Sequence, residues 1–156
     1  MKCKERLEAY LRENGVAYET RHHPLAYTAQ EVAAAEHLPG KFLAKVVMVK
    51  GDERLVMLAM PAPSRVDLAK LKAVLGAGEV RLAREEEFAD LFPDCEVGAM
   101  PAFGNLYGVE VYTDKSLSED EKIIMQAGTH TDTIALAYAD FERLVKPKSA
   151  EFARHA

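Results

Sequence analysis

The stretch FLAKVVMV, residues 42–49, decides the fold of this chain. Its apolar and β-branched residues continue without a break except at Lys45, a pattern typical of a strand buried on both faces. A lysine in such a strand must lose hydration, find an anionic partner or point into a cleft. Lysines are seldom placed there for structural reasons, so Lys45 is the first candidate for a functional residue.

A hairpin extends from this strand. Residues 50–53 read KGDE and predict a turn, and residues 55–60 read LVMLAM and predict the antiparallel return strand, closed by Pro61 and Pro63. Further strands are expected at 16–20, 80–82, 107–112, 122–125 and 133–138, and helices at 5–14, 32–36, 68–75, 85–91 and 141–145. Hairpins and helices are mixed rather than alternating regularly, which indicates an α+β fold with a mixed or largely antiparallel sheet flanked by helices.

Polar residues mark the expected helix starts. Thr28 and Glu31 form a capping-box pattern ahead of an alanine-rich segment. Ser64 or Asp67 precedes the helix at 68–75, and Asp140 precedes the final helix. These caps predict helices before and after the predicted hairpin along the chain.

Length and composition suit one globular domain over residues 1–156. The chain is 49% hydrophobic and 29% charged, and no apolar run approaches the ~20 residues of a membrane span. The first six residues lack the apolar core of a signal peptide. Cys3 and Cys95 match no metal or redox spacing; they leave a disulfide open, and a reducing cytoplasm is the simpler interpretation.

The net charge of −5 argues against strong non-specific binding to nucleic acid. The charge is unevenly distributed, however. Residues 1–75 hold 12 basic and 9 acidic side chains, whereas residues 76–156 hold 8 basic and 16 acidic ones. The N-terminal half can therefore present a local basic surface, although an unevenly charged solvated surface explains the same numbers.

Two glycine-containing segments are candidate site loops. Residues 97–104 read VGAMPAFG, and glycines there would let main-chain N–H groups approach a carbonyl or phosphate oxygen. Residues 127–131 read AGTHT and bring hydroxyls and an imidazole into a turn between two strands. Each segment alone is also compatible with an ordinary loop or hairpin turn.

The histidines predict no metal site. His22 and His23 are adjacent and would point to opposite faces of a strand, His37 lies near a helix end and His155 lies in the tail. No zinc-binding spacing occurs, so we expect neither a metal nor a cofactor. His130 alone is a candidate for hydrogen bonding or acid–base work. No nucleophile motif is present either.

Taken together, these motifs resemble the YbaK/prolyl-tRNA synthetase-associated family of aminoacyl-tRNA editing domains. The resemblance covers almost the whole chain and depends on the order and spacing of several segments. These are 23–24, 28–33, 39–40, Lys45 in its strand, 66–68, 98–104 and 127–128. It implies the family's fold, in which a barrel-like mixed sheet is flanked by helices.

The resemblance also implies roles for particular residues. Lys45 matches the family's principal functional residue. The loop residues expected to shape the substrate pocket are Gly98, Pro101, Phe103 and Gly104, and we add Gly128 and His130 from the second turn. Two positions depart from the family pattern: Ala102 stands where the deacylases usually have proline, and Val46 stands where they tend to have a polar residue. Both departures concern the identity of the amino acid that is edited.

The leading hypothesis is a trans-acting deacylase that hydrolyses the ester of a mischarged tRNA in the cytoplasm. The implied partner is the aminoacylated 3′ end of tRNA, with an aminoacyl-tRNA synthetase as a further candidate, and we expect a monomer that does not engage membranes. Two alternatives stay open: a module that binds tRNA or a nucleotide without turnover, and a hydrolase of another small aminoacyl ester. Saturable binding without ester hydrolysis would favour the binding module, and equal turnover of free aminoacyl-ester analogues and tRNA would favour the small-ester hydrolase.

Overall fold

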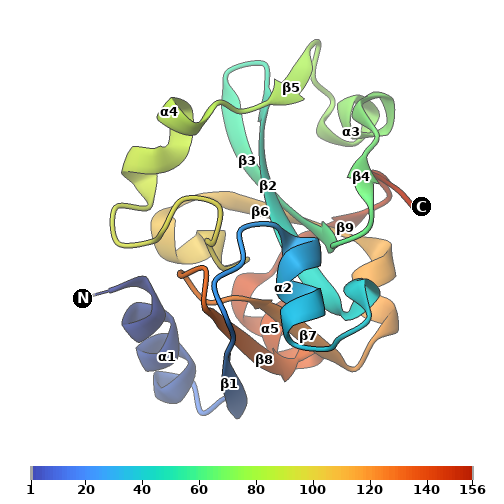
Figure 1. The fold of residues 1–156 in the computed structure, drawn as a ribbon. Helices are drawn as coiled ribbons and strands as arrows, with labels where there is room; N and C mark the ends of the chain where they lie inside the picture. Colours follow the sequence, from blue (N-terminus) through green and yellow to red (C-terminus); the bar gives the residue numbers. More distant parts are fainter. Residues whose placement is uncertain (1, 156) are drawn as a thin grey trace.

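A computed structural model describes residues 2–155 and contains a mixed sheet with helices packed around it (Figure 1). The α-helices are α1 (Cys3–Glu13), α2 (Ala29–Ala35), α3 (Leu68–Leu75), α4 (Glu85–Phe88) and α5 (Tyr138–Val145). The strands are β1 (Tyr18–His22), β2 (Leu43–Gly51), β3 (Arg54–Pro61), β4 (Arg65–Val66), β5 (Val80–Leu82), β6 (Glu110–Asp114), β7 (Lys122–Gln126), β8 (Asp132–Ala137), β9 (Lys148–Ala150) and β10 (Ala153–Arg154). Short 3₁₀ helices include η1 (Gly40–Phe42), η2 (Ala89–Leu91), η3 (Gly104–Tyr107) and η4 (Lys115–Glu119).

Strand β2 lies at the centre of the main sheet, whose strand order is β1-β8-β7-β2-β3-β6-β9, with β5 pairing separately with β2. It pairs antiparallel with β3 and β5 and parallel with β7. The β2–β3 hairpin forms as predicted and rises away from the rest of the sheet in Figure 1. The expected α+β class with a mixed, largely antiparallel sheet is confirmed.

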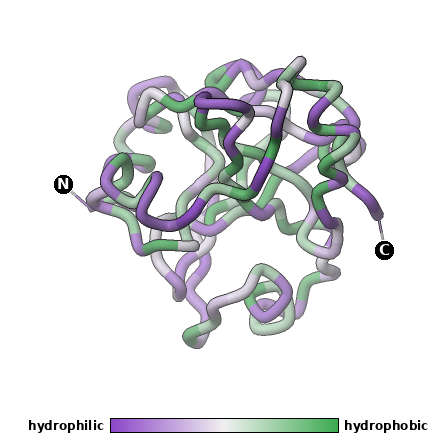
Figure 2. The backbone as a smooth tube through the Cα atoms, turned by 90° about the horizontal axis from the view of Figure 1, so that it is seen from above, coloured by the Kyte–Doolittle hydropathy of each residue, from purple (hydrophilic) through white to green (hydrophobic). Residues whose placement is uncertain are grey.

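Helices cover the sheet at separate places. Figure 1 shows α2 near the start of β2 and α3 beside β4 and β5, with α1 and α5 lower in the view. The largest core cluster joins α1, α5 and the face of β2 that carries Ala44 and Met48. In Figure 2, hydrophobic stretches cross the middle of the molecule and alternate with hydrophilic ones along the chain. None of the helices in residues 2–155 is long and apolar enough to cross a membrane.

Several predicted caps are present, and one is wrong. The Thr28 side chain accepts the N–H of Glu31 at 3.1 Å, and Asp67 accepts from the second and third residues of α3. The final helix starts earlier than expected, at Tyr138, so Asp140 lies in its first turn instead of capping it. Tyr138 continues the alternation of the preceding strand in the sequence, yet in the structure it begins the helix.

Other boundaries differ where short-range patterns are weak. The strand expected at 107–112 begins at Glu110, because Tyr107 ends η3 and Gly108 turns the chain with a φ of 71°. Strands β4, β9 and β10 were not predicted. They have only two or three residues each, and they exist because partner strands align them rather than because their own sequence alternates.

Candidate functional site

Lys45 lies on the face of β2 opposite the largest core cluster. Side chains alternate along a strand, so Lys45 shares its face with Leu43, Val47 and Val49. Leu43 packs in a small cluster under α2, and Val49 packs in another cluster with α3. Lys45 is half-buried between the two, at the point where neither helix covers the strand. Val46 points the other way and packs against the main core.

A polar cavity of about 340 Å³ opens beside Lys45. Its second cation is Arg65, an exposed residue of β4. The remaining lining residues come from the start of α2 and from the turn after β3: Thr28, Ala29, Gln30, Ala62, Pro63 and Ser64. Within residues 2–155, neither Lys45 nor Arg65 has a carboxylate within 4.0 Å. The cavity therefore holds two positive groups whose charge no protein side chain neutralises.

The ammonium group of Lys45 is less stable here than in water. Burial lowers the pKa of Lys45 from its usual range, and the positive charge of Arg65 lowers that pKa further. An anionic or strongly dipolar ligand in the cavity would reverse both effects, because it would replace lost hydration and separate the two like charges. The electrostatics thus favour a phosphate, carboxylate or polarised carbonyl oxygen at this place.

The turn between β7 and β8 carries His130 and contacts the loop that precedes Gly98. The His130 N–H donates to Glu96 Oε1 at 3.1 Å, and His130 Nε2 lies 3.0 Å from the carbonyl oxygen of Val97. Because a carbonyl can only accept, Nε2 carries the proton, which leaves Nδ1 as an acceptor. That buried Nδ1 has no hydrogen-bond partner among the described residues. A Cβ built on Gly98 would lie 3.6 Å from the ring, so the two predicted residues are neighbours.

Asp132 holds the turn in place. Its carboxylate accepts from the hydroxyls of Thr129 and Thr131 at 2.6 and 3.3 Å and pairs with Lys4 and His22. Burial would raise the pKa of Asp132, but these hydrogen bonds and the Lys4 charge outweigh it and bring the pKa to about 2. The ionised carboxylate is thus a fixed acceptor at neutral pH, and it orders the turn that presents His130.

An exposed aromatic segment connects the two regions. The ring of Tyr27 lies 4.9 Å from the ring of His130, centroid to centroid, while the next residue, Thr28, lines the Lys45 cavity. Tyr27 is 62% exposed and Leu25 is 61% exposed, so this segment presents apolar surface to solvent. The start of the segment is fixed, since the N–H of His23 donates to the carbonyl of Thr131 at 2.8 Å.

Part of the predicted substrate loop belongs to the core instead. Phe103 has no exposed surface and packs edge-on against Tyr10 and Phe141. A Cβ on Gly104 would lie 2.8 Å from the carbonyl oxygen of Val109 and 2.9 Å from Cγ2 of Val111, so this glycine permits close packing with β6. Pro101 is buried as well. Phe103 and Gly104 are therefore part of the core under the loop, and their expected role in shaping the substrate pocket stays a prediction.

The cavity beside Lys45 is not lined by residues of the 98–104 loop. Sequence patterns pointed to Lys45, Gly98, Gly128 and His130 but missed Arg65 and Tyr27. Arg65 follows the proline-rich turn after β3, and its nearness to Lys45 arises only when that turn folds back over β2.

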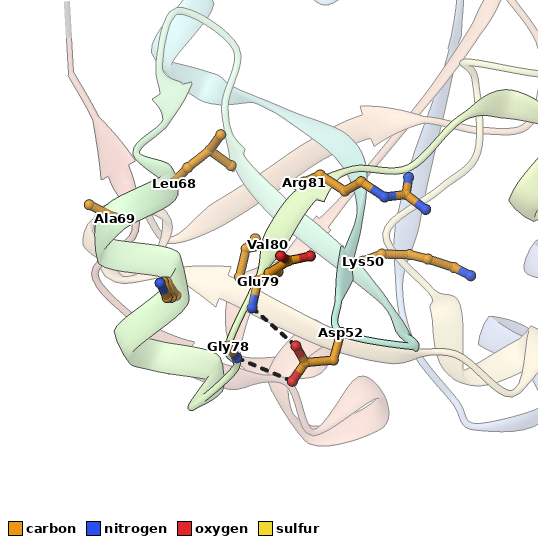
Figure 3. Close-up of a pocket in the computed structure, with 9 residues that line it drawn as sticks. Lys50, Asp52, Leu68, Ala69, Gly78, Glu79, Val80 and Arg81 are labelled. Carbon is orange, nitrogen blue, oxygen red and sulfur yellow. Dashed lines mark hydrogen bonds between the residues drawn. The ribbon is translucent and has the colours of Figure 1, made fainter.

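A second hollow, of about 400 Å³, lies between α3, β5 and the β2–β3 turn (Figure 3). One of its two carboxylates is already engaged: Asp52 accepts the N–H groups of Gly78 and Glu79 at 3.2 and 3.0 Å. Lys50 and Arg81 both pair with Glu87. The other two charged lining residues, Lys72 and Glu79, are of opposite sign, so this hollow lacks the pair of like charges found in the Lys45 cavity and is a weaker candidate.

The comparison with protein families decides the assignment. Residues 23–144 match the model of the aminoacyl-tRNA editing domain. The chain belongs to the aminoacyl-tRNA editing domain family. The predicted family resemblance is thereby confirmed, and the matched range of this editing domain contains Lys45, Arg65, Gly98, Gly128 and His130.

Part of the chain is similar to part of longer proteins. The chain is 32% identical over 89 residues to a proline–tRNA ligase of Bacillus cereus strain AH187 and to one of Bacillus anthracis strain CDC 684 / NRRL 3495. Each match covers 57% of this chain and only 16% of the ligase. The similarity therefore concerns one part of those enzymes.

Solved structures share the fold of this editing domain. The hypothetical protein APE2540 superposes with a TM-score of 0.86 at 18% identity, covering 96% of this chain and 99% of its own. A protein proposed to be a trans-editing enzyme for prolyl tRNA synthetase superposes with a TM-score of 0.84 at 20% identity, covering 99% and 98%. At these identities the likeness establishes the fold.

Proposed function

We propose that this editing domain hydrolyses, in trans, the ester that joins an amino acid to the 3′ end of a mischarged tRNA. The observation that carries the proposal is the pair of unneutralised cations, Lys45 and Arg65, in a polar cavity of a chain that belongs to the editing family. A tRNA 3′ end supplies both the phosphate and the ester oxygens that such a cavity favours.

The chemistry requires positioning more than a protein nucleophile. An aminoacyl ester is activated, so the site must orient a water molecule and stabilise the developing oxyanion. Lys45 would bind the terminal phosphate or the ester carbonyl through its ammonium group. The Gly98 N–H has no hydrogen-bond partner in the part of the chain that the structure describes, so it is a candidate oxyanion donor. A ribose hydroxyl of the substrate would help to place the water.

His130 gives the substrate a second contact. Its unpartnered Nδ1 is buried, so it can accept a hydrogen bond from the substrate's ammonium group or from a hydroxyl only once the neighbouring Tyr27 ring moves aside. The Val97 carbonyl fixes the tautomer, so this acceptor is prepared before the substrate binds. Together the two regions would hold the nucleotide end of the substrate near Lys45 and the aminoacyl end near His130, with Tyr27 between them.

Hydrolytic editing suits a translation apparatus that cannot discriminate by binding alone. One methylene group changes binding by only ~1–3 kcal/mol, so a second, hydrolytic selection step improves fidelity. The similarity to part of proline–tRNA ligases makes prolyl-tRNA synthetase the synthetase we propose as a functional partner, and the cytoplasm the compartment.

The test is a panel of mischarged tRNAs incubated with purified wild-type protein and with Lys45→Ala. We expect the variant to lose about 100-fold or more in deacylation rate while its circular dichroism and melting temperature stay close to those of the wild type. Lys122→Ala, which removes an exposed lysine at the start of β7, is the matched control and should retain full activity. Full activity in Lys45→Ala would exclude the proposed role. Saturable tRNA binding without turnover in the wild type would instead support a binding module.

A further inference from the structure

A disulfide joins two distant parts of the chain next to the His130 turn. It links Cys3, the first residue of α1, to Cys95, which lies 92 positions later in the loop after η2. Their Cα atoms are 4.9 Å apart, and the Cys3 N–H donates to the carbonyl oxygen of Asp94 at 3.0 Å. The bond therefore ties the start of α1 to the loop that leads into Gly98.

The segments on both sides of the disulfide support the turn that carries His130. On the loop side, the Glu96 N–H donates to the carbonyl of Gly128 at 2.9 Å, and Glu96 and Val97 provide the two acceptors that hold His130. On the helix side, the sulfur of Cys3 lies so close to Gly128 that a Cβ there would be 2.6 Å from it. The disulfide thus clamps the two segments between which His130 is positioned.

A cavity lies beside this bond. Both cysteines line a cavity of about 680 Å³, and Cys95 is half-buried rather than enclosed. The other lining residues come from the chain start, the loop and the turn: Lys2, Lys4, Glu5, Pro93, Asp94, Glu96, Gly128, Thr129 and Asp132. The Tyr107 hydroxyl lies 3.3 Å from one sulfur and 3.4 Å from the other. The cavity is large enough for a low-molecular-weight thiol to approach the sulfurs.

We propose that Cys3 and Cys95 are a reversible thiol–disulfide modification site whose oxidised form fixes the His130 turn. The co-reactant is a small disulfide such as oxidised glutathione. One protein thiolate attacks it, forming a mixed disulfide and releasing one small thiol; the second protein thiolate then attacks the mixed disulfide and releases the other. The two protein thiols are oxidised, the small disulfide is reduced to two thiols, and the two protons end on those thiols.

The dithiol form differs from the oxidised form in one respect that matters for the site. Without the bond, residues 94–98 are attached to α1 only by a backbone hydrogen bond and side-chain contacts, so the loop opens more often. Glu96 Oε1 and the Val97 carbonyl oxygen, which accept hydrogen bonds from His130, then lose their fixed position. This inference extends the proposed function, since its effect on catalysis presupposes that the chain is a deacylase, whereas its effect on local opening does not.

The experiment compares full-length protein equilibrated with reduced and with oxidised glutathione. Alkylation followed by mass spectrometry should count two reactive thiols in the first sample and none in the second. Hydrogen exchange at residues 94–98 and 128–131 should be at least about tenfold faster in the reduced sample, with residues 76–80 unchanged as an internal control. Deacylation should fall several-fold on reduction, as roughly expected for a loosened site.

Cys95→Ser is the matched variant, because serine preserves the size of the side chain and cannot form the bond. It should exchange at the reduced rate in both buffers; Cys3→Ser serves the same purpose if the first variant folds poorly. The proposal is overturned if both thiols stay alkylatable after incubation with oxidised glutathione, or if the bond forms without changing exchange at either segment. Redox-dependent exchange with no deacylation in either state would leave this site intact and refute only the proposed function.

Discussion

The Nε2–H of His130 donates to the carbonyl oxygen of Val97 across 3.0 Å, so a strand turn and a loop more than 30 residues earlier share one hydrogen bond. This bond fixes which ring nitrogen is free to accept. It also means that the position of His130 depends on the path of the loop that leads to Gly98. A substitution that moves either His130 or Val97 should therefore change the position of His130 Nδ1.

Replacing His130 should impair turnover more than folding. For His130→Asn we expect kcat/KM for a mischarged tRNA substrate to fall by about 10- to 100-fold, because the shorter amide cannot make the Nε2–H bond to the Val97 carbonyl that holds the side chain in place. The measurement is single-turnover hydrolysis alongside thermal melting. His37→Asn is the control, since His37 is exposed with a φ of 57°, a conformation that asparagine tolerates well. Equal rates for both variants would remove His130 from the site.

Gly128 should be far less tolerant of alanine than another glycine of similar backbone conformation. Gly128 has a φ of 98° and Gly108 a φ of 71°, so an alanine at either position would have to adopt an unfavourable left-handed backbone conformation. Only at Gly128 would the added Cβ meet Cys3, at 2.6 Å from Sγ and 2.7 Å from Cβ, and the disulfide prevents Cys3 from moving away. We expect Gly128→Ala to cost about 3 kcal/mol and Gly108→Ala about 1 kcal/mol in urea unfolding. Similar costs would show that the close contact relaxes.

Arg65 should affect the pKa of Lys45 without being needed for folding. In Arg65→Ala the pKa of Lys45 should rise, because a like charge is lost, yet stay below its usual range, because burial is the larger cause of the shift. Lysine-resolved NMR titration reads this directly. If Arg65 contacts tRNA phosphate, the salt dependence of tRNA binding should also weaken by about 0.7 in log–log slope.

Arg154→Ala is the control for Arg65. Arg154 pairs with Arg65 across the β4–β10 ladder, but its charge is engaged by Asp67 at 3.5 Å. Its removal should leave both the pKa of Lys45 and the salt slope unchanged. An unchanged slope in Arg65→Ala would place the nucleic acid away from this cavity.

Asp132 should make stability depend on pH in the acid range. Its pKa is lowered from 3.8 to about 2 in the folded protein, so the folded state binds fewer protons than the unfolded state. The stabilisation is therefore fully present above about pH 4 and is lost as the pH falls towards 2. Since part of the network reaches solvent, we expect Asp132→Asn to cost about 1–2 kcal/mol at pH 7.

Chemical unfolding of wild type and Asp132→Asn at several pH values tests this. The difference between the two proteins should shrink steadily between pH 4 and pH 2. A difference that stays constant over that range would mean that the carboxylate charge is not what stabilises the turn.

Sequence patterns predicted the central hairpin, α3 with its Asp67 cap and the bounds of β5, because alternation and glycine or proline boundaries act over a few residues. They failed for β9 and β10, whose pairing depends on partners elsewhere in the chain. For the site, Lys45 was visible as a charge in an apolar strand. Arg65 and Tyr27 were not, since nothing in their own segments shows that folding brings them to Lys45 and His130.

The glycine-rich loop shows the opposite limitation. Glycine at 104 is required because β6 packs against it, and Phe103 is a core residue, yet the sequence offers the same letters for a ligand loop and for a tightly packed one. Burial, which sequence alone does not provide, separates the two roles. Of the two departures from the family pattern, Ala102 is buried, whereas Val46 is partly buried and faces away from Lys45.

The central place of β2 has a consequence for which parts of the protein open locally. Strands at the margins of a sheet, here β1 and β9, open in small local fluctuations. Strand β2 is held by β3 along most of its length, by β7 at Leu43 and Ala44 and by β5 at residues 49–51. Lys45 lies on this strand between the two regions of double pairing, while Arg65, Tyr27 and His130 are on short or surface segments. In the proposed site the lysine is therefore the fixed point, and the groups around it are the ones free to adjust.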